Sequence, residues 1–146
     1  MRKTLAIAAA LAVAAIGSAQ AQNGPNLIEM RQVGFSLMAG DFAGIRAVSA
    51  LKGDVKTLEN PAKAMQRYAA LIPSLFPQGT AAGNNTKALP AIWSDNDGFV
   101  KAAAGLGEAT GKLAELAKAG DADGVAAQIK VVGDACGACH RPYRAR

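Results

Sequence analysis

The chain of 146 residues has few histidine and cysteine ligands for a metal ion, because it contains only two cysteines and one histidine. A single histidine excludes any site in which two imidazoles of this chain bind one ion. A structural zinc site needs four protein ligands, so it would have to recruit carboxylates. Only Asp134 lies close to the cysteines in the sequence. Zinc is therefore a poor interpretation of these residues.

The sequence also lacks the features of nucleic-acid-binding and membrane-spanning proteins. No run of basic residues is mixed with aromatics, so nucleic acid is not an expected partner despite the net charge of +5. The one long apolar run, Leu5 to Ile16, is shorter than the roughly 20 residues that a spanning helix needs. We therefore expect no membrane insertion of the mature chain.

The N-terminus is typical of a secretory signal. Arg2 and Lys3 precede the apolar run, and Ala19-Gln20-Ala21 follows it as a cleavage site. These features predict that residues 1–21 are removed and that the mature chain, residues 22–146, is exported to the periplasm. A retained anchor helix is the alternative, and the shortness of the apolar run disfavours it.

The mature chain is expected to be one all-α domain, an antiparallel up-down four-helix bundle. Alanine is abundant, runs of β-branched residues are scarce, and apolar residues recur at spacings of three and four. The four helical segments are predicted at about 25–51, 54–75, 91 or 95 to 119, and 121 to 140 or 143. A loop rich in Gly, Asn, Thr and Pro separates the second segment from the third, over 77–90.

Local signals predict where these helices begin and end. Asp54 can cap the second helix, and Pro61 means that this helix is either kinked or begins late. Gly120 can end the third helix and Asp121 can cap the fourth. Such a short connection predicts that the third and fourth helices are antiparallel neighbours.

The two cysteines and the histidine form one motif, Cys136-Gly137-Ala138-Cys139-His140. C-x-x-C-H is the attachment signature of a c-type haem, in which both thiols become thioethers and the imidazole binds the iron. The cysteines continue the apolar stripe of the fourth helix, so both sulfurs are expected to point into the bundle. The motif predicts one covalently bound haem c near one end of the bundle, with His140 as its metal ligand.

Two further interpretations use the same cysteines. A thiol–disulfide exchanger places C-x-x-C at the start of a helix, where the dipole favours the thiolate, whereas this motif lies near the end of one. A structural disulfide between Cys136 and Cys139 would link almost nothing. Because there is no second histidine, the sixth position of the iron is expected to hold a methionine, to hold a weaker group, or to be empty. The mature chain offers three methionines: Met30, Met38 and Met65.

These residues resemble the cytochrome c′ family over essentially the whole mature chain. The likeness depends on the C-x-x-C-H motif close to the C-terminus with Tyr143-Arg144 after it, and on the short Gly120-Asp121 turn. It also depends on two stretches at the starts of the first and third helices: Arg31-Gln32 followed by Phe35 and Leu37-Met38, and Pro90-Ala91-Ile92-Trp93-Ser94-Asp95. The family fold is a four-helix bundle.

The resemblance implies a role for each matching residue. Cys136 and Cys139 would form the thioether links, and His140 would be the proximal ligand. Arg31, the one charged residue on the apolar stripe of the first helix, would lie near a haem propionate, and Gln32 would be a further haem contact. Arg144 would be a proximal arginine one helical turn beyond His140, although Pro142 is expected to disturb that turn. Phe35 would cover the distal haem face.

Phe35 cannot bind iron, so the chain resembles the five-coordinate, high-spin members of the family. An open iron behind an apolar wall favours nitric oxide and carbon monoxide and offers bound O₂ no hydrogen-bond donor. The expected function is electron transport or reversible binding of these gases, with no substrate turned over and with redox partner proteins that the sequence does not name. The resemblance also implies a homodimer through the first two helices. The alternatives are a low-spin cytochrome with Met38 or Met65 as sixth ligand and a haem-free dithiol protein.

Overall fold

The structure is a computed structural model that describes residues 26–146, so the predicted signal lies outside the described residues. The described chain is helical. Its elements in order are α1 (Leu27–Ala50), η2 (Val55–Leu58), α2 (Glu59–Leu71), η3 (Ile72–Leu75), α3 (Ala91–Ser94), α4 (Asn96–Ala119) and α5 (Ala122–Tyr143).

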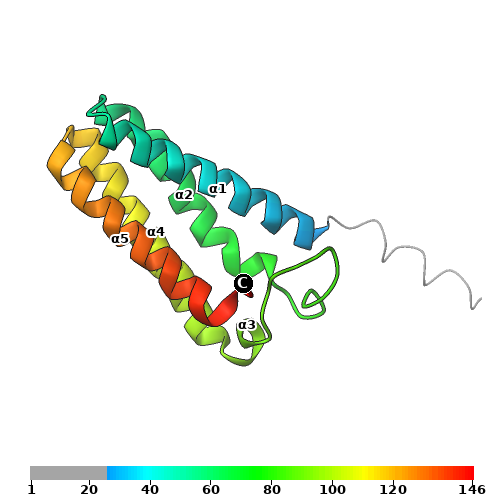
Figure 1. Ribbon diagram of the computed structural model, residues 1–146. Helices are drawn as coiled ribbons and strands as arrows, with labels where there is room; N and C mark the ends of the chain where they lie inside the picture. The colour runs from blue at the N-terminus through cyan, green and yellow to red at the C-terminus, as the bar shows by residue number, and fades with distance from the viewer. Residues whose placement is uncertain (1–25) are drawn as a thin grey trace, which may run out of the picture.

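The long helices run antiparallel along one another and form the predicted all-α four-helix bundle (Figure 1). Helix α4 packs most extensively against α2 and α5, whereas α1 rests mainly on α2. The core contains the predicted apolar stripes, including Met38 and Ile45 of α1 and Val125 and Val132 of α5. None of the helices within residues 26–146 combines the length and the apolar composition needed to cross a bilayer.

The second segment begins as a 3-10 turn, and this decides between the kinked helix and the late helix start predicted from Pro61. The Asp54 side chain caps this turn, because its Oδ1 accepts a hydrogen bond from the Lys56 backbone at 2.9 Å. Helix α2 then begins at Glu59, so Pro61 falls in its first turn, where a missing backbone donor costs nothing. The helix begins late and is not kinked by this proline.

The third segment contains both predicted starts. Helix α3 is a single turn, Ala91–Ser94, and Asp95 then leaves the helical conformation with φ −125° and ψ 56°. The Asp95 carboxylate accepts the Gly98 backbone N–H and caps α4. Because of this break, α4 begins as a separate helix at Asn96. The second carboxylate oxygen of Asp95 can then accept a hydrogen bond from another element.

The connection between α4 and α5 is as short as predicted. Gly120 lies in the left-handed region at φ 75°, where a side chain would be strained, and its N–H bonds the Ala117 carbonyl. Asp121 then caps α5 by accepting the Gly124 N–H at 2.8 Å. These two residues form the turn end of the bundle, opposite the end that carries the C-x-x-C-H motif (Figure 1).

The disturbance expected from Pro142 is confined to Arg144. Helix α5 continues through Pro142 and ends at Tyr143. Tertiary contacts hold this last turn, since the Tyr143 carbonyl accepts the Leu89 N–H at 3.0 Å and the Tyr143 ring packs on Phe99. Arg144 is extended and lies just past the helix, although its N–H still bonds the His140 carbonyl at 3.1 Å. It therefore does not sit on a helical turn beyond His140.

Candidate haem-binding site

Cys136 and Cys139 are free thiols that lie one turn apart on α5 and pack against the core. Burial raises the pKa of both thiols, and for Cys139 the neighbouring Cys136 adds to the effect. The thiolate is the nucleophile in disulfide exchange, so a raised pKa disfavours a dithiol redox site. The raised pKa of the two thiols is compatible with their conversion to thioether links.

His140 follows Cys139 near the C-terminal end of α5 and is largely exposed. Partial desolvation lowers the pKa of its imidazole, and the positive charge of Arg144 lowers it further. The neutral imidazole is the form that binds a metal. Within residues 26–146, no group of three or more histidine, cysteine or acidic side chains could hold a metal ion, which argues against a zinc site built by these residues alone.

Arg31 is buried, with only 2% of its surface exposed, on the same helix face as Met38. Its Nη1 donates to the Leu75 carbonyl at 3.2 Å and to Thr80 Oγ1 at 2.9 Å. Its Nη2 donates to the Thr80 carbonyl at 2.7 Å and to Thr86 Oγ1 at 2.9 Å. All four acceptors are neutral. Desolvation lowers the pKa of the guanidinium, as expected for a buried cation without a carboxylate partner.

The other predicted contacts lie close to this arginine or at the chain end. Gln32 is exposed, and its Nε2 donates to the Asn84 carbonyl at 2.8 Å. Arg31 and Gln32 thus both bind the loop over 77–90, which sequence reasoning left without a role. Phe35 lies one turn further along α1, half-buried against the core cluster that the two cysteines also contact. Arg144 is exposed and forms an isolated bridge with Ala88.

Aromatic rings link Phe35 on α1 to Tyr143 at the end of α5, and sequence reasoning missed this. Phe35 meets the Tyr68 ring edge-on, with centroids 5.6 Å apart, and also packs on Phe76 at 6.3 Å. Phe76 continues to Phe99 at 5.0 Å, and Phe99 to Tyr143 at 5.3 Å. The only sequence signal was that aromatics are rare yet recur in segments that meet at this end.

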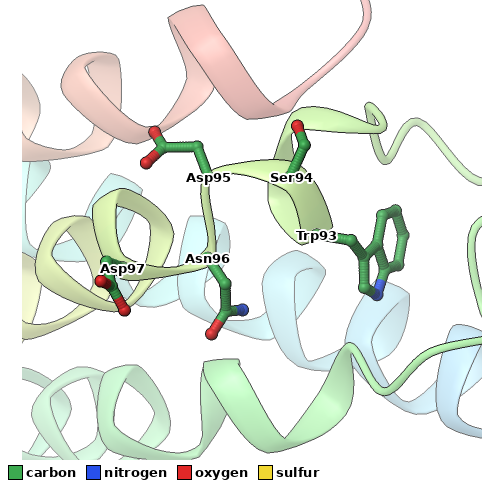
Figure 2. Close-up of a pocket in the computed structure, with 5 residues that line it drawn as sticks. All are labelled: Trp93, Ser94, Asp95, Asn96 and Asp97. Atoms are coloured by element: carbon green, nitrogen blue, oxygen red, sulfur yellow. The ribbon is translucent and has the colours of Figure 1, made fainter.

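Asp95 joins the cap of α4 to the end of α5. Its carboxylate points toward α5 beside an open depression lined by residues 93–97 (Figure 2). Asp95 Oδ2 accepts a hydrogen bond from the Tyr143 hydroxyl at 2.6 Å. This bond, with a smaller effect of burial, raises the pKa of Tyr143 to about 12. Tyr143 is three residues beyond His140, so the bond fixes the turn that carries the predicted ligand.

These residues fit a covalently bound haem. The two thiols are unpaired and face the core, and the imidazole that follows them is biased toward its neutral, ligating form. Arg31 is a buried cation whose partners are all neutral, and a buried charge is stabilised by a paired anion. A haem propionate has that charge. The structure therefore supplies two thiols for the attachment, an imidazole for the iron and a buried cation on α1.

Comparison with known proteins agrees with this chemistry. The family profile described as "Cytochrome C′" matches residues 26–144. Cytochrome c′ of Rubrivivax gelatinosus is 33% identical over 129 residues, covering 87% of this chain and 100% of the relative. Cytochrome c′ of Rhodospirillum rubrum is 30% identical over 149 residues, covering 99% of both chains.

Solved structures extend the likeness to three dimensions. The crystal structure of cytochrome c′ from Thermochromatium tepidum has a TM-score of 0.77 and 31% identity, and the match covers 82% of this chain and 95% of that one. A nitric oxide complex of a point mutant of cytochrome c prime from Alcaligenes xylosoxidans has a TM-score of 0.74 and 30% identity, covering 83% and 94% of the two chains. Together with the C-x-x-C-H motif on α5, these matches show that the chain belongs to the cytochrome c′ family of haem proteins.

Proposed function

We propose that the mature chain is a periplasmic monohaem c-type cytochrome that transports electrons and reversibly binds nitric oxide or carbon monoxide, without turning over a substrate. The observation that carries the proposal is that Cys136 and Cys139 pack against the core near the C-terminal end of α5, with His140 directly after them. The two thiols hold the cofactor and the imidazole binds its iron. When bound, the haem supplies one redox-active iron with a free coordination position.

Arg31 and Gln32 orient the cofactor in this proposal. Arg31 is held by Thr80 and Thr86, so its guanidinium is already ordered and desolvated before it meets a propionate. Preordering lowers the entropy lost when the pair forms, and a charged hydrogen bond is stronger than a neutral one. Gln32 supports the same loop through Asn84. Arg144 lies near His140 at the chain end and contributes positive charge on the proximal side.

Phe35 leaves the distal position of the iron without a protein ligand. Its ring packs against Tyr68 and Phe76 and offers neither a lone pair nor a polar hydrogen. Met38 and Met65 are buried members of the core cluster, 8% and 1% exposed, which is the ordinary packing role of methionine. A five-coordinate, high-spin iron behind an apolar wall favours small uncharged gases. The nitric oxide complex of the Alcaligenes xylosoxidans relative supports this choice of ligand.

We also propose that the protein is a homodimer through α1 and α2. Three large apolar side chains are exposed along α1, with Met30 at 47%, Val33 at 53% and Leu37 at 67%. Their spacing places them on one face of the helix. A related cytochrome c′ of 28% identity was solved with a ligand-controlled dimer dissociation, which supports an association of this kind. Leu37→Glu is expected to shift the mass in sedimentation from dimer to monomer, whereas Val131→Glu, on exposed α5 surface, leaves it unchanged.

The decisive experiment is a spectrum of the protein exported by a host that matures c-type cytochromes. We expect haem that stays on the chain in denaturing electrophoresis, a mature N-terminus at Gln22 by mass spectrometry, and a high-spin signal from the oxidised protein at neutral pH. A low-spin signal would contradict the five-coordinate proposal and favour Met38 or Met65 as a ligand. A chain without haem would contradict the proposal as a whole.

A further inference from the structure

Gly34 leaves a notch on α1 into which the ring of Tyr68 fits. A Cβ atom at Gly34 would overlap the hydroxyl end of that ring. Of the glycines inside α1, Gly40 and Gly44 have no such neighbour, so the close approach of α2 is specific to Gly34. The absence of a side chain at this position is therefore what lets the Tyr68 ring lie flush against the helix.

The Tyr68 ring makes one contact with α1 at each of its ends. Its hydroxyl donates to the Arg31 backbone carbonyl at 3.0 Å, on the turn that precedes Phe35. Its edge meets the Phe35 ring at 5.6 Å with an interplanar angle of 89°. Tyr68 thus ties α2 to the turn of α1 that carries the predicted distal residue.

The second aromatic neighbour of Phe35, Phe76, is packed on several sides. Phe76 is buried, and the Arg31 guanidinium lies 4.2 Å from its ring centroid. Phe76 also contacts Phe99 and Trp93, so it has no room to move aside. Tyr68 is only half-buried, so its ring is less confined by surrounding atoms than the ring of Phe76.

We infer that Tyr68, seated in the notch at Gly34, is a positioning residue that limits how far the Phe35 ring moves when a diatomic ligand approaches the distal side of the iron. This inference rests on the proposed function. A gas that enters from the distal side has to displace Phe35, and packed rings move only where their neighbours allow it. The contact between the Tyr68 and Phe35 rings therefore slows ligand entry. The position of the Tyr68 ring in the notch at Gly34 determines how close this contact is.

The test measures carbon monoxide association with the ferrous haem-loaded protein by stopped flow. Tyr68→Ala is expected to raise the association rate about two- to tenfold, the effect of losing one edge-to-face ring contact. Gly34→Ala raises it in the same direction, because the new methyl group displaces the Tyr68 ring. Tyr68→Phe keeps the ring and loses only the hydroxyl bond, so its rate lies between wild type and Tyr68→Ala. Gly105→Ala, a helical glycine whose Cβ would meet nothing, is the matched control and leaves the rate unchanged.

A second readout does not depend on gas binding. In urea unfolding of the same haem-loaded proteins, Gly34→Ala lowers the midpoint when Tyr68 is present, because the methyl group and the ring compete for one space. In the Tyr68→Ala background the same substitution raises the midpoint, because alanine is the better helix former. The change in urea midpoint caused by Gly34→Ala therefore has opposite signs with and without Tyr68, as expected if the two side chains occupy the same space.

The outcomes separate the inference from the proposed function. If the wild-type spectrum is high-spin while Tyr68→Ala and Gly34→Ala both leave the association rate unchanged, the inference is overturned and the proposed function stands. The same holds if Gly34→Ala raises the urea midpoint in both backgrounds. A low-spin or haem-free wild-type protein overturns the proposed function and the inference with it.

Discussion

The two ends of the bundle are built from different side chains. At the turn end, around Gly120 and Asp121, the core is aliphatic and small, with Leu113, Ala117 and Val125 fully buried. At the site end, six of the seven aromatic residues form one connected cluster around a buried arginine. Small aliphatic residues let helices pack closely, whereas at the site end large rings pack on one another and on the guanidinium of Arg31. Both ends therefore stabilise the bundle, whereas only the site end carries the residues of the proposed haem site.

The largest expected effect comes from removing the central ring of the aromatic cluster. Phe76→Ala is expected to lower the free energy of unfolding by about 4 kcal/mol, because a large buried ring leaves a cavity. Leu113→Ala at the turn end is expected to cost about 3 kcal/mol for the same reason. Urea unfolding measures both. The haem spectrum should change only in Phe76→Ala, and equal spectra would contradict the division between the two ends.

Arg31→Ala tests the buried cation. We expect a loss of about 3 kcal/mol in the free energy of unfolding, because Leu75 and Thr80 lose a charged donor. The control is Arg46→Ala, an exposed arginine on the same helix, which is expected to change stability by less than about 0.5 kcal/mol. Urea midpoints compare the two variants. Equal midpoints would show that the loop does not depend on Arg31.

Two matched caps compare the ends directly, because Asp95 and Asp121 each accept the N–H of a glycine three residues later. Asp121→Ala is expected to cost about 1 kcal/mol, the usual value for an N-cap. Asp95→Ala is expected to cost about 2 kcal/mol, because it also removes the acceptor of the Tyr143 hydroxyl. Thermal or urea unfolding of both variants checks this order, and a reversed order would contradict a stabilising Asp95–Tyr143 bond.

The smallest expected effect is a pH dependence confined to the site end. The hydrogen bond to Asp95 raises the pKa of Tyr143 to about 12, above the ordinary value of 10.0. A raised pKa means that the bond stabilises the fold fully below pH 10 and is lost as the pH rises toward 12. The difference in urea midpoint between wild type and Tyr143→Phe should therefore shrink over that range. A difference that stays constant with pH would show that the hydroxyl bond contributes nothing.

Features set by neighbouring residues could be predicted well. Asp54, Gly120 and Asp121 cap or end helices as expected, because each acts on backbone groups within a few positions. For Pro61 the sequence predicts either a kink or a late helix start, and only the observed 3-10 turn decides between them. Pro142 itself stays helical, because contacts from Leu89 and Phe99 hold Tyr143 in place, and the helix is lost only at Arg144.

The candidate site divides in the same way. Because the C-x-x-C-H spacing and the 3.6-residue period are local, the sequence by itself determined the helical class, the attachment motif and its face on α5. Only the tertiary structure decided what surrounds Arg31, whose partners lie 44 to 55 positions away, and that Tyr68 fits against Gly34. Contacts between helices depend on how the whole bundle packs, and no short stretch of sequence encodes that packing.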